Sequence, residues 1–173
     1  MKSLLYKLSG LGLVLSLLAL CPAAGQAVNH KAHSVFLFNF ARYAEYPASA
    51  NNEVIRFGIL GSNGVFEELD AVLKAKLING KKCVVERVTA FNSLNYYHII
   101  FVADGESSKL DELLAALGTK PTLVVTERDN LVRKGAAISF FVSDDSKLRF
   151  QVNNEALSKS NIQLAASLRS LAQ

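Results

Sequence analysis

The residue types best suited to recognising another molecule lie close together before a proline. Arg42, Tyr43 and Tyr46 precede Pro47, and Asn39 lies about one helical turn earlier. Arginine offers a planar fork of donors, and both arginine and tyrosine are enriched at the energetic centres of protein interfaces. The stretch therefore predicts a surface that binds a protein partner or a small ligand. The alternative is that its aromatic rings belong to the core and its arginine covers apolar surface.

The three histidines give a weaker indication of chemistry. His30 and His33 lie three residues apart, which alone is a weak signal for a metal site. If processing leaves Val28 as the first residue, its amino group, two backbone amides and the His30 imidazole offer square-planar nitrogens to Cu(II) or Ni(II). Such a terminus arises often by chance, so we predict no metal site. His98, beside an apolar run, is typical of a core histidine.

Residue patterns for catalysis are weak. The loop 61–64 (Gly-Ser-Asn-Gly) follows a predicted strand and opens a predicted helix, where phosphates bind in nucleotide folds. It lacks the Gly-x-Gly-x-x-Gly and Gly-Lys-Ser/Thr motifs, so we expect an ordinary turn. The carboxylates at 67–70 begin a helix, and those at 144–145 lie in a turn, so neither cluster needs a catalytic explanation. No Gly-x-Ser-x-Gly motif occurs, and we expect neither an enzyme nor a cofactor.

Periodicity predicts the helices that must position these residues. Residues 30–45 favour a helix, because Phe36, Phe40 and Tyr43 share helical spacing and Pro47 follows. A second helix should begin with Ser62 or Asn63 as its cap and run to residue 73. A third should follow a capping box formed by Ser108 and Asp111 and end at Gly118. Leucines 164, 168 and 171 predict a last helix.

Apolar runs predict six strands, at 54–60, 83–89, 97–103, 122–126, 136–142 and 147–153. The first four alternate with helices, which implies a mostly parallel sheet covered on both faces. The last two flank Ser143–Ser146 and predict a hairpin. The predicted fold is a three-layer α/β sandwich. Its mixed, mostly parallel sheet has about six strands, with an antiparallel C-terminal hairpin and helices on both faces.

The amino-terminal segment has the layout of a secretory signal peptide. Lys2 and Lys7 give a positive start, and the apolar run that follows, 8–20, is too short for a comfortable membrane span. A small, helix-breaking segment comes next. Gly25 and Ala27 suit signal peptidase, so we place the cut after Ala27.

We therefore expect residues 1–27 to be cleaved and residues 28–173 to form a single domain in the periplasm. One alternative is a lipoprotein lipidated at Cys21, for which Leu20 is an unsuitable neighbour. Another is an uncleaved amphipathic anchor. The signal layout favours cleavage over both.

The composition argues against a nucleic-acid-binding protein and against an internal disulfide. The formal charge of +4 falls by two when the signal lysines are removed, and no long basic block occurs, so we expect no nucleic-acid partner. Cys83 is then the single cysteine, which excludes an internal disulfide. We expect a buried structural thiol at this position, and an intermolecular or redox thiol is the alternative.

Several blocks in order along the chain are distinctive together. They are Lys31-Ala32 with 36–43 and Tyr46-Pro47, then 57–61, 98–102, 123–127, 135–140 and 148–153. Their order and spacing resemble the YfiR-like family of small periplasmic regulatory proteins, and the similarity covers nearly all of the mature chain. The opening motif of that family commonly ends in Trp-Pro, where this chain has Tyr46-Pro47.

The resemblance implies a protein that binds the periplasmic part of an inner-membrane diguanylate cyclase and represses cyclic-di-GMP synthesis and biofilm formation. It also implies an α/β sheet and a tendency to form a homodimer. The family is broad, so a sensor kinase is an alternative partner. The best-known members carry redox-linked disulfides, which Cys83 cannot form within one chain.

We assign the partner- or ligand-binding residues from residue type and from the opening motif: Asn39, Arg42, Tyr43, Tyr46, Arg149 and Asn153. The alternative function is a periplasmic small-molecule-binding protein without a dedicated protein partner. In that case Arg42, Tyr43 and Tyr46 would line its pocket.

Overall fold

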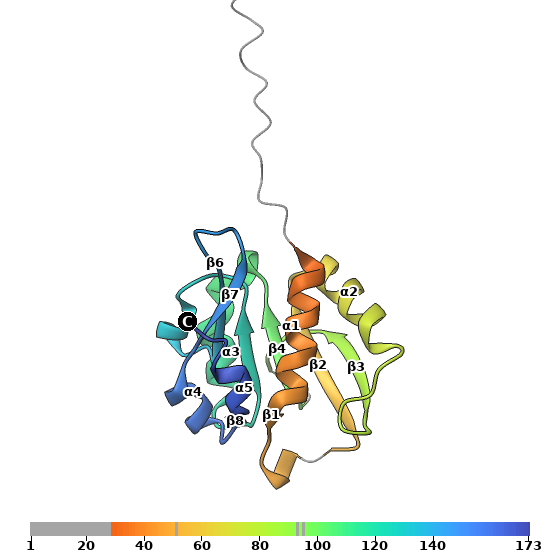
Figure 1. The fold of residues 1–173 in the computed structure, drawn as a ribbon. Coiled ribbons are helices and arrows are strands. Elements are labelled where there is room, and N and C mark those ends of the chain that lie inside the picture. Colours follow the sequence, from red (N-terminus) through yellow and green to blue (C-terminus); the bar gives the residue numbers. More distant parts are fainter. Residues whose placement is uncertain (1–28, 51, 93, 95) are drawn as a thin grey trace, which may run out of the picture.

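A six-stranded sheet lies at the centre of the structure, a computed structural model that describes residues 29–50, 52–92, 94 and 96–173 (Figure 1). The strands are β2 (Val54–Leu60), β3 (Lys82–Arg87), β4 (Ile99–Val102), β5 (Leu123–Thr126), β6 (Ile138–Val142) and β7 (Leu148–Val152). The predicted signal peptide and its cleavage site lie outside the described residues. No helix of the described part is long and apolar enough to cross a membrane.

The strand order is β3-β2-β4-β5-β6-β7. The first five are parallel, and β7 pairs with β6 in the antiparallel direction. Among the parallel strands this is the 2-1-3-4-5 order of one type of doubly wound α/β fold. β3 lies on one side of β2, and the later parallel strands lie on the other side. The strand order therefore reverses between β2 and β4. The predicted mixed, mostly parallel sheet with an antiparallel hairpin is confirmed.

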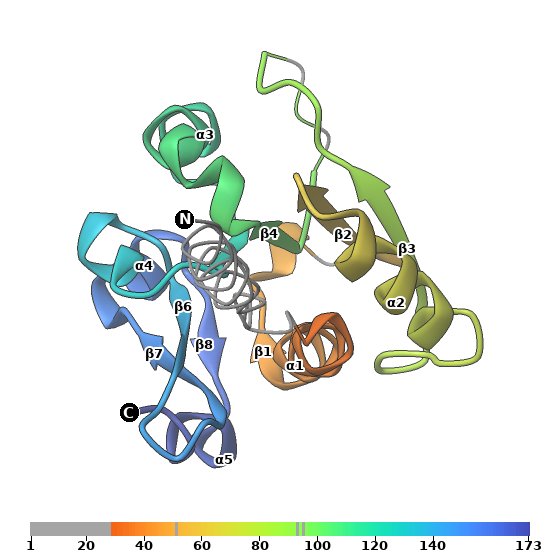
Figure 2. The ribbon, with the colours of Figure 1, turned by 90° about the horizontal axis from the view of Figure 1, so that it is seen from above.

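Helices cover both faces of the sheet, as predicted (Figure 2). The helices α1 (His30–Tyr43) and α2 (Asn63–Leu73) pack on one face, and α3 (Leu110–Leu117) covers the other. Two short 3₁₀ helices, η2 (Asp104–Lys109) and η3 (Leu131–Lys134), flank α3 along the chain. Each face has its own apolar core, and the larger core lies beneath α1 and α2.

The segment after α1 differs from the sequence prediction. The predicted helix 30–45 ends at Tyr43, because Ala44 adopts an extended conformation and begins β1 (Ala44–Glu45). This strand pairs antiparallel with β8 (Gln163–Leu164) in a second, two-stranded sheet. A 3₁₀ helix, η1 (Ala48–Ala50), follows Pro47. A partner that is remote in sequence therefore ends the helix before the proline does.

The region after β7 also contains elements that periodicity did not predict. A short helix, α4 (Asn154–Lys159), precedes β8, and α5 (Ala166–Arg169) follows it. Asn153 caps α4 by accepting a hydrogen bond from the Ala156 amide at 3.0 Å. The helix predicted from the spacing of leucines 164, 168 and 171 is thus only the short α5, because Leu164 belongs to a strand.

The predicted capping box before α3 is wrong. Ser108 lies inside η2, and α3 begins at Leu110 with Lys109 at its cap position and no side-chain capping bond. Glu127 reaches the Asp104 amide at the other end of η2. The cap predicted for α2 is confirmed, since the Ser62 side chain accepts a hydrogen bond from the Val65 amide at 3.2 Å.

Candidate functional site

The outer face of α1 presents the first group of predicted binding residues. The Asn29 side chain starts the helix by accepting the Ala32 amide at 3.0 Å. The apolar residues Leu37, Phe40 and Ala41 turn this helix toward the sheet and are buried. This packing leaves the opposite side of the helix to solvent along its whole length.

Three of the predicted residues lie on that side of α1. Arg42 is exposed, Tyr43 is 40% exposed and Asn39 is half-buried. The Arg42 guanidinium lies 5.5 Å from the centre of the Tyr43 ring, within cation–π range. Val35, two turns earlier, is 44% exposed. We name the surface formed by Val35, Asn39, Arg42 and Tyr43 the α1 face.

Tyr46 does not join the α1 face. Its ring turns inward, and its hydroxyl donates a hydrogen bond to the carbonyl of His98 at 3.0 Å. The two rings meet edge to face, with centroids 5.2 Å apart. Burial raises the pKa of Tyr46 well above its ordinary value, with the neighbouring Tyr96 adding to the shift. Tyr46 therefore anchors the loop after α1 to the start of β4.

Arg149 and Asn153 lie at opposite ends of β7 and are both engaged in local contacts. Arg149 donates to Ser143 Oγ at 3.1 Å and to an Asp145 carboxylate oxygen at 3.2 Å, in the β6–β7 turn. Asn153 caps α4 and donates from its amide nitrogen to the Val132 carbonyl at 2.7 Å. The six predicted residues therefore do not form one site, and Asn39, Arg42 and Tyr43 form the group that the fold brings together.

Side chains fill the carboxyl ends of the parallel strands, where doubly wound folds usually bind their ligands. Gly61 has a φ of +89° after β2, and the side chain of Glu106 lies directly against it. Glu106 pairs in turn with Lys109 at 2.6 Å. A carboxylate at this turn repels a phosphate, which supports the interpretation of the 61–64 loop as an ordinary strand-to-helix turn.

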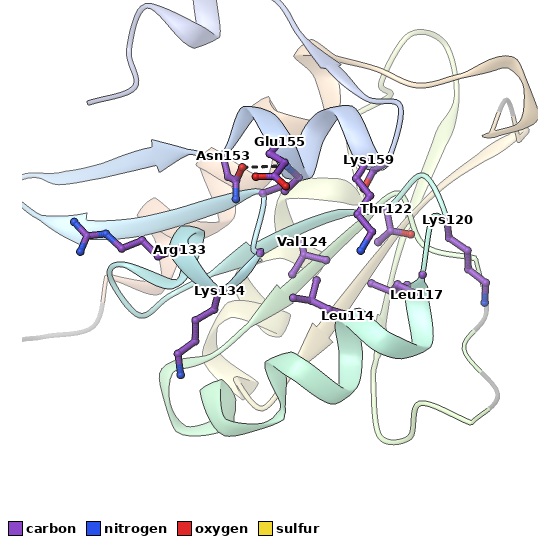
Figure 3. A pocket seen from close by; sticks show the side chains of 15 residues that line it. Leu114, Leu117, Lys120, Thr122, Val124, Arg133, Lys134, Asn153, Glu155 and Lys159 are labelled. Atoms are coloured by element: carbon purple, nitrogen blue, oxygen red, sulfur yellow. Dashed lines mark hydrogen bonds between the residues drawn. The ribbon is translucent and has the colours of Figure 1, made fainter.

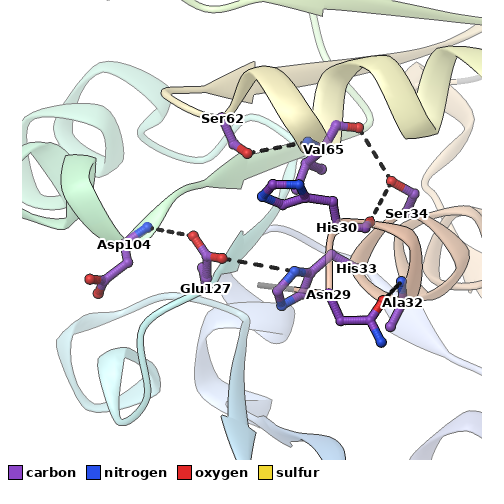
Figure 4. Close-up of polar contacts among 9 residues, drawn as sticks. All are labelled: Asn29, His30, Ala32, His33, Ser34, Ser62, Val65, Asp104 and Glu127. Carbon is purple, nitrogen blue, oxygen red and sulfur yellow. Dashed lines mark hydrogen bonds and ion pairs between the residues drawn. The ribbon is translucent and has the colours of Figure 1, made fainter. Parts of the chain in front are cut away.

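His33 lies at the same end of the sheet, and sequence analysis did not single it out as a buried group. It is 4% exposed and packs against the rings of Phe140 and Phe101, at centroid distances of 4.8 and 5.6 Å. Its Nδ1 is 3.8 Å from a carboxylate oxygen of Glu127, and neither ring nitrogen has a hydrogen-bond partner among the described residues (Figure 4). Glu127 accepts the Asp104 amide at 2.8 Å.

Burial determines the charge state of His33. Desolvation, and after it the neighbouring His30, lower the pKa of His33 to about 4. The imidazole is therefore neutral at pH 7, and its contact with Glu127 is not an ion pair there. The His30 ring lies against Gly64. The described residues contain no group of three or more side chains able to hold a metal ion together. The spacing of His30 and His33 alone could not show that one of the two rings is buried, because burial depends on residues that are remote in sequence.

Cys83, in β3, is a free and half-buried thiol. Burial raises the pKa of this thiol above its ordinary value. Since the thiolate is the reactive form of cysteine, a raised pKa makes Cys83 a poor nucleophile at neutral pH.

The fold and these surfaces define a class of protein: a doubly wound α/β domain with polar and aromatic side chains exposed on its first helix. A family model described as YfiR/HmsC-like matches residues 30–173. The chain therefore belongs to the YfiR/HmsC-like family, which confirms the resemblance found in the sequence blocks. The family is one of periplasmic regulatory proteins. A search of the curated proteins found no match.

Proposed function

We propose that this protein is exported to the periplasm, loses residues 1–27, and binds and represses an inner-membrane diguanylate cyclase there. Membership in the YfiR/HmsC-like family is the observation that carries the proposal. A sensor kinase is the alternative partner. The proposal assigns the protein a binding role, with no catalytic step and no cofactor.

The α1 face is the part of the protein that we propose contacts the partner. It carries an arginine and a tyrosine, two residue types enriched at interface hot spots, beside an exposed apolar side chain, Val35. Arg42 has no acidic partner among the described residues. It is therefore available to a carboxylate of the partner. Tyr46, Arg149 and Asn153 support the scaffold instead.

The proposed mechanism is a shift between two states of the cyclase. A bound protein can favour the inactive state only if it binds that state more tightly than the active one. A signal that weakens this binding would release the cyclase. Once residues 1–27 are lost, Cys83 is the single cysteine, so a disulfide within one chain has no role in the proposed release. A homodimer, which the family resemblance implies, stays a prediction for light scattering to test.

The small-molecule alternative rests on a different region from the one expected. Arg42, Tyr43 and Tyr46 line none of the three cavities described for this structure, although Asn39 borders a shallow groove and Asn153 a deeper cleft. A ligand site between Arg42 and Tyr46 is therefore not supported by the geometry.

A pull-down from solubilised membranes tests the proposed function, with the protein purified from the periplasm as bait. We expect recovery of a membrane protein that carries a cytoplasmic diguanylate cyclase domain. Arg42→Ala with Tyr43→Ala should reduce the recovery at least about tenfold, because hot-spot residues each contribute about 2 kcal/mol or more. The same double variant, produced in cells, should raise intracellular cyclic-di-GMP.

The matched control is Lys82→Ala with Leu77→Ala. It also removes one exposed cation and one exposed large apolar side chain, on a different part of the surface. Equal loss in both double variants would contradict the α1 face as the contact. Recovery of a sensor kinase would support the alternative partner, and recovery of no membrane signalling protein would contradict the proposed function.

A further inference from the structure

A cleft lies at the amino ends of β5 and β6, on the face of the sheet that α3 covers (Figure 3). It has a volume of about 300 Å³, which is at the lower end of the range for small-molecule sites. The end of α3, the start of β5, the segment before β6 and α4 form its walls. The cleft is thus assembled from segments that are far apart in sequence.

Small residues keep this cleft open. Gly118, Gly135, Ala137 and Ala156 all line it. Gly135 has a φ of +102°, and a Cβ added there would lie 3.1 Å from Leu114, so a larger residue is disfavoured at this wall. Ala137 is buried at the base. A larger side chain at any of these positions would occupy part of the space.

The floor of the cleft is apolar. Leu114, Leu117 and Val124 line it from α3 and β5. Thr122 also lines it, but its hydroxyl is already used, since it donates to the Tyr97 carbonyl at 2.7 Å. Asn153 is likewise engaged by Val132 and Ala156. A ligand body that rests on this floor is therefore expected to be apolar.

The rim of the cleft is basic. It carries Lys120, Arg133, Lys134 and Lys159, and a single acid, Glu155. Figure 3 shows Lys159 extending from α4 toward Thr122, with Lys120 and Lys134 at the two sides of the opening. None of the four cations forms an ion pair within the described part of the chain. Elsewhere, Arg56, Lys109 and Arg128 each have a carboxylate partner.

We propose that this cleft binds a small organic anion with an apolar body. The apolar part would lie on Leu114, Leu117 and Val124, and a carboxylate or phosphate would lie between Lys134 and Lys159. Several cations around one opening raise the local concentration of anions, and an apolar floor selects those with a hydrocarbon part. The inference goes beyond the proposed function, because the cleft can bind its ligand whether or not a membrane partner exists.

Octanoate is a suitable probe, because it joins a carboxylate to a short apolar chain. The protein purified from the periplasm is titrated with octanoate and followed by two-dimensional ¹H–¹⁵N NMR. We expect saturable shifts that cluster at the amides of Gly118, Thr122, Gly135 and Ala156, and weaker binding at higher salt. Octanol, which has no charge, should bind at least about tenfold more weakly.

The double variant Lys134→Gln with Lys159→Gln tests the assignment of the charges. Each lost lysine should weaken octanoate binding about 5- to 10-fold, as expected for a charge-assisted hydrogen bond that solvent exposure weakens. Lys159→Arg should keep most of the affinity. The matched control is Lys82→Gln with Arg169→Gln, which removes two exposed cations outside the cleft and should leave binding unchanged.

Three outcomes would overturn the proposal: no saturable binding, shifts scattered over the basic surface, or equal losses in the cleft and control variants. The same chemistry could come from a free anion or from an anionic phospholipid. Sedimentation with phosphatidylglycerol vesicles, compared with phosphatidylcholine vesicles, distinguishes these sources. Lysine-dependent binding to phosphatidylglycerol vesicles, and not to phosphatidylcholine vesicles, would support the lipid source. Octanoate binding without vesicle binding would support a free anion.

Discussion

At the carboxyl ends of the parallel strands, charged side chains contact one another, whereas the cations at the amino-end cleft have no acidic partner among the described residues. Lys109 pairs with Glu106, and Arg128 pairs with Asp104, at the first end. Lys134 and Lys159 border open space at the second. The two ends of one sheet therefore differ in whether these cations have a carboxylate partner.

This difference reverses the usual arrangement of doubly wound folds. Such folds generally bind ligands in a crevice at the carboxyl ends, near the point where the strand order reverses. Here Glu106 covers Gly61, and His30 lies against Gly64, so side chains of the protein occupy that position. The topology therefore indicates where a crevice can form, and the side chains decide whether it stays open.

The largest expected effect comes from opening the filled end. Phe140 is fully buried and contacts the rings of His33, Phe36 and Phe40. Phe140→Ala should lower the free energy of unfolding by about 3–5 kcal/mol, because it removes buried apolar surface and leaves a cavity. Urea unfolding measures the change. Leu114 is half-buried in the floor of the cleft, so Leu114→Ala should cost less than half as much. Equal losses would contradict the contrast between the ends.

The second expected effect is a dependence of folding stability on pH. It involves His33, at the carboxyl end, and His98, at the amino end. Burial lowers both pKa values from 6.5 to about 4. Because the folded state keeps both rings neutral, the unfolded chain binds more protons between these values. Stability is therefore unaffected above pH 6.5 and falls as the pH drops toward 4. Each histidine should cost roughly 2 kcal/mol between pH 7 and pH 5.

One variant at each end tests how much of this pH dependence comes from each histidine. His33→Phe should remove about half of the stability loss between pH 7 and pH 5 in urea unfolding. His98→Asn should remove the other half, and its amide oxygen can still accept the Arg56 amide that now donates to His98 Nδ1 at 3.1 Å. A pH dependence unchanged in both variants would show that other groups cause the loss.

A smaller effect is expected from a hydrogen bond near the amino end. Tyr46→Phe removes the bond from the hydroxyl to the His98 carbonyl, so unfolding should become easier by about 1 kcal/mol. Tyr43→Phe removes a hydroxyl from the exposed α1 face and should change stability by less than about 0.3 kcal/mol. If Tyr43→Phe proved the more destabilising in thermal unfolding, the assignment of Tyr46 to the scaffold would be wrong.

The smallest expected effect belongs to the open end. Lys134→Gln with Lys159→Gln should change the free energy of unfolding by no more than about 0.5 kcal/mol, because both side chains are exposed and lack an ion-pair partner among the described residues. Chemical denaturation checks this. A large loss of stability would mean that these lysines hold the cleft together, and that they are not free for a ligand.

Local signals predicted much of the fold. The β2 strand has the bounds expected from its apolar run, and Ser62 caps α2 as expected. The two apolar runs that flank Ser143–Ser146 correctly indicated the β6–β7 hairpin. These features depend on residues close in sequence, such as a cap side chain and the amide three residues later. A single sequence can reveal such contacts.

Non-local contacts account for the errors. The helix expected over 30–45 ends two residues early because Ala44 pairs with Leu164, far along the chain. The Ser108–Asp111 capping box fails because the chain there forms η2. Tyr46 has the composition of a contact residue, yet its hydroxyl meets the carbonyl of His98, and no local pattern predicts that meeting.

The sequence alone determined the layered α/β class, the position of α1 and the resemblance to the YfiR/HmsC-like family, because periodicity and ordered blocks are properties of the chain itself. The tertiary structure decided which polar groups became buried, paired or free. His33 is neutral because two phenylalanine rings from different strands enclose it. The cleft exists because α3, β5 and α4 converge there. Burial and charge depend on neighbours in space, and those neighbours are set only when distant segments pack together.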